Sequence, residues 1–373
     1  MADDGGQDDR PFGAWDDLLA SVPRHPTPAP ENVRSLLPFL AIITALVLVA
    51  GIVTAATHHD AAGSPWAALA HPSAACRTAS PEVTGTRRLP LHVVTSPFRS
   101  ALVDVCIDGK GPFPFKLDTG AAQTVLDTSL VAALGLARTG PAFAATGVQC
   151  QASSQPIRID NWSAGGLTLD PQPAVTVRLD GAGGGSGRFA GLFGEDVLSR
   201  FGAVRIDLGS QALTVASGEG APLTGSGVIQ GPTAAVTPPS LVTGVRQIST
   251  VVVIPHQDST AQVLAPVTIG GRRAAFYVDT GSSVSVVAPA VVAAAHLQTL
   301  GPKVRIRALS CNVEVGTVRT GPWSLGGAAL TPRPVIEASI GQRGQGILGL
   351  DAIAGAGQWL VIDYRGGRLI IGT

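Results

Sequence analysis

Phe115–Gly120, with the sequence Phe-Lys-Leu-Asp-Thr-Gly, recurs as Phe276–Gly281, with the sequence Phe-Tyr-Val-Asp-Thr-Gly, 161 residues further along the chain. Trp162–Gly166 and Trp323–Gly327 are separated by the same interval. This interval is far longer than the roughly 20–50 residues of solenoid repeats. The sequence therefore predicts one duplicated lobe rather than a repeat array.

A shorter motif follows in each copy. Gly191–Gly194, with the sequence Gly-Leu-Phe-Gly, recurs as Gly346–Gly349, with the sequence Gly-Ile-Leu-Gly, 155 residues later. The shorter spacing indicates a loop near residues 181–187 that is present only in the first copy. Several features in one order at nearly constant spacing indicate two equivalent folds.

Each copy has the pattern of β structure. Apolar runs separated by Gly-containing turns are typical of hairpins. These runs are Leu89–Val94, Ala101–Ile107, Thr250–Ile254 and Val263–Ile269, with turns at Asp108-Gly109 and Gly270-Gly271. One helix is expected in each copy, at Ser129–Leu136 with Asp127 or Thr128 as its N-cap, and at Ala290–Leu297 with Pro289 in its first turn.

Composition excludes several classes of protein. Charged residues make up 14% of the chain, against about 25% in an average soluble protein, which argues against a coiled coil. With 46 glycines and 28 prolines, a helix-dominated fold is disfavoured. The net charge is zero and there is no basic run, so no nucleic-acid partner is expected.

A membrane anchor is predicted at residues 36–56. This almost wholly apolar stretch of 21 residues matches the length of about 20 that a helix needs to cross a bilayer. Arg24 and Arg34 precede it, whereas the first basic residue beyond it is Arg77, so the N-terminus is expected in the cytoplasm and the duplicated lobes outside. A cleaved signal peptide is the alternative, but it fits less well because 35 residues precede the apolar run.

The domain boundaries follow from these features. We expect a disordered acidic tail, a transmembrane helix in contact with the lipid bilayer, a spacer, lobe 1, a linker and lobe 2. They span residues 1–35, 36–56, 57–81, 82–216, 217–243 and 244–373.

The duplicated motifs resemble the retropepsin-like and pepsin-like aspartic proteases, in a membrane-anchored form of bacterial type. That family has Asp-Thr/Ser-Gly-Ala/Ser after apolar residues, and later two apolar residues followed by Gly. The first copy has Leu117–Ala121 and Leu192–Gly194; the second has Val278–Ser282 and Ile347–Gly349. Lys116 interrupts the apolar pair in the first copy.

The resemblance implies an all-β, bilobal acid-protease fold made of two β-barrel-like lobes. It also implies that Asp118 and Asp279 are the catalytic pair of an aspartic endopeptidase. Two carboxyl groups in contact share one proton and so provide an acid and a base for water attack on a peptide bond. No cofactor or metal is expected. The expected partner is a peptide or protein substrate in an extended conformation, bound by a monomeric catalytic unit.

The family pattern also assigns supporting roles in the two loops. Thr119 and Thr280 are expected to form hydrogen bonds across the pseudo-twofold axis. The other residues expected to support the loops are Gly120, Gly281, Ala121, Ser282, Gly194 and Gly349. A Ser282 hydroxyl donating to Asp279 would favour the charged form, so Asp279 is predicted to ionise more readily and Asp118 to retain the proton.

The chain departs from the family in its loops and flaps. Retroviral members carry an Asp–Arg pair that braces these loops, but Ala122, Ser283, Glu195 and Leu350 occupy the corresponding positions. The flaps are expected at residues 143–152 and 304–313, without the flap tyrosine of pepsin.

All four cysteines follow the predicted anchor, which predicts two disulfides in an oxidising compartment. Three pairings are possible among Cys76, Cys106, Cys150 and Cys311. A Cys150–Cys311 bridge would tie the two flaps over the cleft and hinder entry, so it is not favoured over pairings of these residues with Cys76 and Cys106.

An alternative function is a catalytically silent peptide-binding module of the same bilobed fold in the cell envelope. Loss of one Asp would favour such a module, and degeneration of one copy would favour a second alternative, a structural envelope protein in which the fold only presents a surface; neither is seen. The motifs Gly-x-Ser-x-Gly and His-Glu-x-x-His are absent from the sequence, so a serine or zinc hydrolase finds no support.

Overall fold

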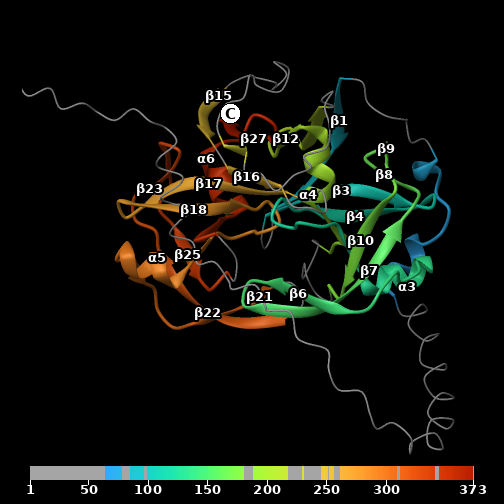
Figure 1. The fold of residues 1–373 in the computed structure, drawn as a ribbon, viewed down its shortest axis with the longest axis horizontal. Coiled ribbons are helices and arrows are strands. Elements are labelled where there is room, and N and C mark those ends of the chain that lie inside the picture. The colour runs from blue at the N-terminus through green and yellow to red at the C-terminus, as the bar shows by residue number, and fades with distance from the viewer. Residues whose placement is uncertain are drawn as a thin grey trace, which may run out of the picture.

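The fold is that of a computed structural model of the 373-residue chain. It describes residues 64–77, 85–95, 99–179, 188–216, 229–230, 245–250, 252–255, 261–308, 311–340 and 344–372. In Figure 1 the two lobes lie side by side, with lobe 1 in blue to green and lobe 2 in orange to red. The predicted bilobal, mostly β fold is confirmed.

Lobe 1 contains a 10-stranded mixed sheet. At its centre β4 (Lys110–Leu117) is parallel to β11 (Gly191–Phe193), which is antiparallel to β5 (Val125–Asp127), and β5 is parallel to β10 (Gln172–Val177). The remaining strands are β2 (His92–Val94), β3 (Ser100–Ile107), β6 (Phe143–Gly147), β7 (Cys150–Ile159), β8 (Trp162–Ala164) and β9 (Leu167–Leu169).

Lobe 2 repeats this arrangement in a 12-stranded sheet. Here β18 (Arg272–Val278) is parallel to β26 (Gly346–Leu348), which is antiparallel to β19 (Val286–Val287), and β19 is parallel to β25 (Pro334–Glu337). The other strands are β14 (Ile229–Gln230), β16 (Val252–Pro255), β17 (Ala261–Ile269), β20 (Gln298–Thr299), β21 (Val304–Ala308), β22 (Cys311–Arg319), β23 (Trp323–Leu325) and β24 (Ala328–Leu330). The duplication in sequence is therefore also a duplication of strand pairing.

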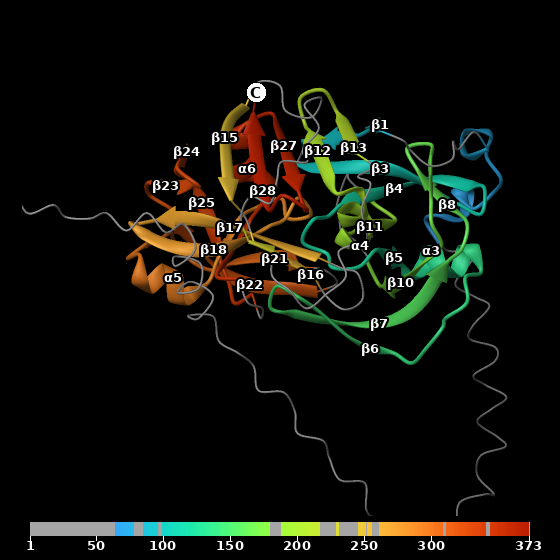
Figure 2. The same ribbon diagram turned by 45° about the horizontal axis from the view of Figure 1, so that its top comes forward.

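A 6-stranded sheet joins the lobes along one side, as Figure 2 shows. Its strands, in spatial order, are β1 (Thr86–Pro90), β13 (Ala212–Ala216), β12 (Ala203–Asp207), β27 (Trp359–Asp363), β28 (Arg368–Gly372) and β15 (Val245–Thr250). The junction is the antiparallel pair β12–β27, in which Arg205 lies opposite Val361. Lobe 1 and lobe 2 thus share main-chain hydrogen bonds.

The expected hairpin turns are present in both lobes. Asp108 and Gly109 have φ values of 52° and 71°, and Gly270 and Gly271 have 54° and 75°. Two successive residues with positive φ are what a type I′ turn requires, and its twist matches that of the flanking strands. These turns fix the register of β3–β4 and β17–β18, the hairpins that lead into the Asp-Thr-Gly loops.

Apolar side chains from both lobes form a continuous core. Phe115 and Phe276, the first residues of the duplicated stretch, are fully buried there. Burying a side chain of this size stabilises a fold by roughly 1.5–3 kcal/mol. The core therefore fixes β4 and β18, the two strands that lead into the Asp-Thr-Gly loops.

Each lobe has two α-helices rather than the one expected. The predicted helices are α3 (Thr128–Leu134), capped by Asp127, and α5 (Pro289–Ala294). The additional ones are α4 (Glu195–Leu198) and α6 (Leu350–Ala356), which begin directly after Gly194 and Gly349. α4 has only four residues, and α6 contains Gly355, a poor helix former, so neither gives a clear helical signal in the sequence. Three 3-10 turns are η1 (Ala67–Leu69), η2 (Ala74–Cys76) and η3 (Ser199–Phe201).

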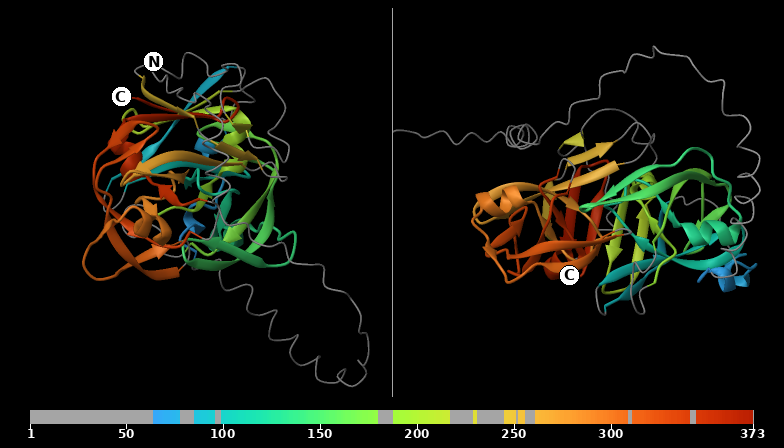
Figure 3. Two further views of the ribbon diagram at one scale, coloured as in Figure 1. Left: turned by 60° about the vertical axis from the view of Figure 1, so that its left-hand side comes forward. Right: turned by 90° about the horizontal axis from the view of Figure 1, so that it is seen from below.

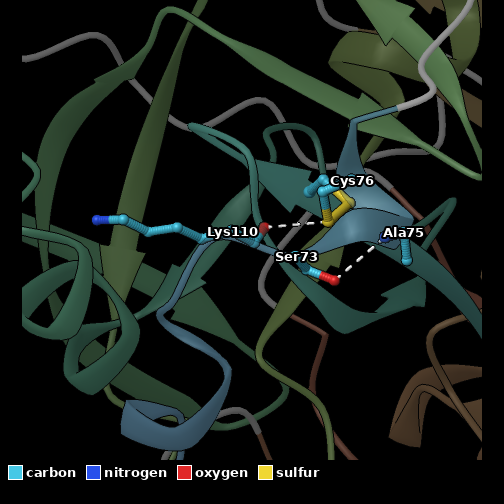
Figure 4. Close-up of a disulfide and its surroundings, with 5 residues drawn as sticks. Ser73, Ala75, Cys76 and Lys110 are labelled. Atoms are coloured by element: carbon cyan, nitrogen blue, oxygen red, sulfur yellow. Dashed lines mark hydrogen bonds between the residues drawn. A yellow bond between two sulfur atoms is a disulfide. The ribbon is translucent and has the colours of Figure 1, made fainter.

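The cysteines form two disulfides, which confirms the predicted oxidation state. Cys76–Cys106 attaches η2 to β3, close to the start of β4 at Lys110 (Figure 4). The other disulfide, Cys150–Cys311, joins the first residues of β7 and β22, with the Cα atoms 6.3 Å apart. The preference against this bridge was wrong, because the two hairpins meet between the lobes (Figure 3).

Within the described part of the chain, no helix is long and apolar enough to cross a membrane. The span predicted at residues 36–56 and the tail before it lie outside the described residues, as do much of the spacer and of the linker.

Candidate active site

Each Asp-Thr-Gly loop begins where a strand ends beside a parallel neighbour. The backbone N–H of Asp118 donates to the Phe193 carbonyl at 3.0 Å, and that of Asp279 donates to the Leu348 carbonyl at 3.1 Å. Parallel pairing brings the carboxyl ends of β4 and β11 together, and likewise those of β18 and β26. This is why the distant Gly motif lies beside the Asp loop in both lobes.

The two loops interlock across the pseudo-twofold axis. A Cβ atom added to Gly120 would collide with the carboxyl group of Asp279, and one added to Gly281 would collide with that of Asp118. Each glycine thus leaves space for the catalytic candidate of the opposite lobe. The structure brings Asp118 and Asp279 together, as the sequence predicted.

Thr119 and Thr280 connect the loops by four hydrogen bonds. Each threonine backbone N–H donates to the hydroxyl of the other, at 3.2 and 3.0 Å. The Thr119 hydroxyl donates to the Val278 carbonyl at 2.8 Å, and the Thr280 hydroxyl donates to the Leu117 carbonyl at 2.9 Å. Both threonines are buried, so these bonds fix one loop against the other.

The two carboxyl groups have unequal surroundings. Asp118 Oδ1 accepts backbone N–H groups from Gly120 at 3.0 Å and Ala121 at 2.9 Å, whereas Asp279 Oδ1 accepts one from Ser282 at 2.9 Å. Burial and then the charge of Asp118 raise the pKa of Asp279 to about 8. Burial also raises the pKa of Asp118, but Lys116, the two N–H groups and a hydrogen bond from Asp279 oppose that rise. The two N–H donors and the nearby ammonium favour the charged form of Asp118, so we assign the shared proton to Asp279.

This assignment corrects the predicted asymmetry of the pair. The Ser282 hydroxyl donates to the Val284 carbonyl at 2.7 Å rather than to a carboxylate. The donor from Ser282 to Asp279 is the backbone N–H, which any residue would supply at that position. Asp118, not Asp279, is the member that ionises more readily.

Lys116 is a site residue that the sequence analysis did not assign. It is two residues before Asp118 on β4, so its side chain leaves the same face of the strand. The ammonium lies over the Phe189 ring, 5.4 Å from its centroid. Burial lowers the pKa of Lys116, while Asp118 and Asp279 oppose the decrease. The interruption of the apolar motif in one copy was the signal for this charge.

A second pair of contacts holds the loops in place of the missing Asp–Arg pair. The Thr124 hydroxyl donates to Asp196 at 2.8 Å, and at the equivalent positions the Ser285 hydroxyl donates to Asp351 at 2.7 Å. Burial raises the pKa of Asp196 to about 6.

Gly194 and Gly349 pack against these loops, as the resemblance implied. A Cβ on Gly194 would meet the Ala121 carbonyl oxygen at 2.9 Å, and one on Gly349 would meet that of Ser282 at 2.9 Å. The next residues, Glu195 and Leu350, donate their backbone N–H groups to the same carbonyls, at 2.9 and 2.8 Å.

Glu195 is fully buried near the pair. Burial raises its pKa well above the usual range; the neighbouring Tyr364 hydroxyl opposes this rise, and Asp118 and Asp196 add to it. Folding therefore favours the protonated form of Glu195. A carboxyl group that keeps its proton only when folded makes stability fall as the pH rises above its unfolded pKa.

We expect the free energy of unfolding to fall from about pH 4 to pH 8, because Glu195, Asp196 and Asp279 all have raised pKa values. Each retained proton contributes a slope of up to about 1.4 kcal/mol per pH unit. Glu195→Gln should reduce this slope, whereas Glu314→Gln on exposed β22 should not. Urea denaturation at several pH values measures it, and an unchanged slope in Glu195→Gln would contradict the assignment.

Among the described residues, no group of three or more His, Cys, Asp or Glu side chains is placed to hold a metal ion. The chemistry available to the site is that of two carboxyl groups sharing a proton.

The two hairpins β6–β7 and β21–β22 coincide with the expected flap regions.

The sequence profile of the aspartyl protease family matches residues 103–197 and 265–352, one segment in each lobe. The two lobes therefore belong to the aspartyl protease family. No protein with a curated description matches the chain.

Solved structures with a similar fold include two proteins. One is an aspartic proteinase from Irpex lacteus, at 13% identity and a TM-score of 0.38, over 77% of this chain and 97% of that one. The other is basic 7S globulin from soybean, at 11% identity and a TM-score of 0.40, over 78% of this chain and 95% of that one.

Proposed function

We propose that the protein is an aspartic endopeptidase in which Asp118 and Asp279 activate one water molecule. The observation that carries this proposal is the contact between two carboxyl groups, one from each copy, and we assign their shared proton to Asp279. A neighbouring acid and base are the requirement for direct attack of water on a peptide carbonyl.

The proton transfers follow from this charge state. Asp118 removes a proton from water as the water oxygen bonds to the carbonyl carbon, and Asp279 gives its proton to the carbonyl oxygen. The tetrahedral diol then collapses. Asp118 transfers its proton to the leaving amine, and Asp279 regains a proton from the diol, so both groups return to their starting state.

Incubation of the purified chain with a linear peptide library, followed by mass spectrometry, tests this function. New internal termini should form, and a peptide that carries a hydroxyl mimic of the tetrahedral diol should inhibit their formation. Saturable peptide binding without new termini would instead identify the chain as the silent binding module.

Lys116 should set the acidic limb of the pH–rate profile. Its positive charge lowers the pKa of Asp118, so Lys116→Met should move that limb to higher pH, and Lys116→Arg should restore it. Ser282→Ala should leave the limb in place, because the hydroxyl is bonded to Val284. The profile of kcat/KM against pH measures the acidic limb in all three variants. An acidic limb that stays at the wild-type pH in Lys116→Met would contradict this electrostatic role.

We also propose that the lobes lie outside the cytoplasm, tethered by residues 36–56. The two disulfides support an oxidising compartment. Protease added to intact spheroplasts should digest the lobes and spare the N-terminal tail. Protection of the lobes would reverse this topology.

A further inference from the structure

The two flap hairpins are covalently joined. Cys150 follows the turn of the β6–β7 hairpin and Cys311 follows the turn of the β21–β22 hairpin, and a disulfide links them. The strands β7 and β22 also lie in contact. The lobes are thus connected here as well as through the 6-stranded sheet, which lies on the opposite side of the molecule in Figure 1.

Residues of the joined hairpins pack against apolar clusters of both lobes that lie close to the two Asp loops. Tyr277 and Asp279 leave the same face of the chain because they are two residues apart at the end of β18. Tyr277 belongs to an apolar cluster of lobe 2, and Val148 from the turn of the lobe 1 hairpin and Val313 from β22 pack against that cluster. The lobe 1 hairpin therefore packs against lobe 2, on the cluster that contains the residue two positions before Asp279.

The lobe 1 side has the corresponding arrangement. Ala145 of β6 and Ala152 of β7 pack against the cluster that contains Leu192 and, from the Asp loop itself, Ala121. In Figure 1 the hairpins and the 6-stranded sheet lie on opposite sides of β4 and β18, the strands that lead into the two Asp loops. With this arrangement, a substrate strand that contacts the two carboxyl groups runs between the Asp loops and the Cys150–Cys311 bridge.

This bridge closes a covalent ring. Cys150 and Cys311 are 161 positions apart, and the chain between them includes Asp279 and is closed by the disulfide itself. The lobe 1 part of this ring ends in β13 and the lobe 2 part begins in β15, and both strands belong to the 6-stranded sheet opposite the disulfide. A strand that passes between Asp279 and the disulfide therefore passes through the ring. A single strand of a linear peptide can pass through a closed ring only if one end of the peptide enters first. A circular peptide has no end, so it can enter the ring only as a loop of two strands.

We propose that this site takes peptide chains that are threaded into it by a free end, and excludes circular chains and segments held between two folded domains. This inference rests on the proposed peptidase function and names its substrate class. The substrates are linear, unfolded chain ends long enough to reach from the entrance to Asp118 and Asp279.

The test compares one well-cleaved sequence of about 30 residues in two forms, linear and joined head to tail. The wild-type chain should cleave the linear form at least about tenfold faster. The double substitution Cys150→Ser with Cys311→Ser opens the ring and should bring the two rates to within about twofold. The matched control, Cys76→Ser with Cys106→Ser, removes the disulfide remote from the hairpins and should retain the wild-type ratio.

A second substrate pair avoids variants altogether. The same sequence is fused to a stable folded domain at one end or at both ends, and wild-type cleavage should be at least about tenfold slower when both ends are blocked. Equal rates for linear and circular peptides, or for the two fusions, would overturn the threading inference while leaving the peptidase intact. Cleavage of no peptide at all would overturn the proposed function, and the inference would fall with it.

Discussion

Asp118→Asn and Asp279→Asn are each expected to lower kcat/KM for peptide hydrolysis by about 10²–10⁴-fold, the range that one acid or base contributes. The first substitution removes the base that accepts the proton of water. The second removes the acid that protonates the carbonyl oxygen. Because Asn has nearly the same shape as Asp and accepts the same backbone N–H groups through its oxygen, the fold should be retained.

Asp127→Asn is the matched control for these variants. Asp127 begins an Asp-Thr-Ser sequence that imitates the motif, yet the structure places it as the N-cap of α3, where its carboxylate accepts the Ser129 N–H at 2.9 Å. Asn is about as good an N-cap as Asp, so kcat/KM should be close to wild type. Full activity in Asp118→Asn or Asp279→Asn, or activity in one isolated lobe at concentrations too low for dimerisation, would rule out the two-carboxylate mechanism.

Thr119→Val is expected to lower the free energy of unfolding by about 2–5 kcal/mol and to reduce activity as well. The substitution removes the hydroxyl that accepts from Thr280 and donates to Val278, and it leaves a buried N–H and a buried carbonyl without that partner. Each lost hydrogen bond costs about 0.5–1.5 kcal/mol, and each unsatisfied buried group about 1–3 kcal/mol.

Thr119→Ser is the control, since it keeps the hydroxyl and should recover most of the lost stability and activity. Urea denaturation measures the free energy of unfolding, and kcat measures the activity. If Thr119→Val unfolds at the wild-type urea concentration, the threonine hydrogen bonds do not hold the two lobes together.

The fold could be predicted from the sequence because the motifs that define it occur twice, in the same order. A single Asp-Thr-Gly is weak evidence, but its recurrence with the Gly motif fixed the equivalence of β4 with β18 and of β11 with β26. The hairpin turns could also be predicted, because Asp108-Gly109 and Gly270-Gly271 tolerate the two successive positive φ values of a type I′ turn, which most residue pairs do not.

The charge distribution at the site could not be predicted in the same way. Assigning the proton required knowledge of where the Ser282 hydroxyl points and how deeply Lys116 is buried, and neither follows from the motif. The disulfide pairing depended on how closely two hairpins from different lobes approach. Sequence spacing contains no such distance, so the argument that a bridge would hinder entry led to the wrong preference.

A ¹³C NMR titration of the aspartate carboxyl groups tests the central claim most directly, with Asp118→Asn and Asp279→Asn used for assignment. We expect Asp118 and Asp279 to titrate as one coupled pair, in which Asp279 loses its proton near pH 8 and does so at lower pH once Asp118 is replaced. Two independent titrations near the ordinary aspartate value of about 3.9, each unaffected by replacement of the other residue, would contradict the account.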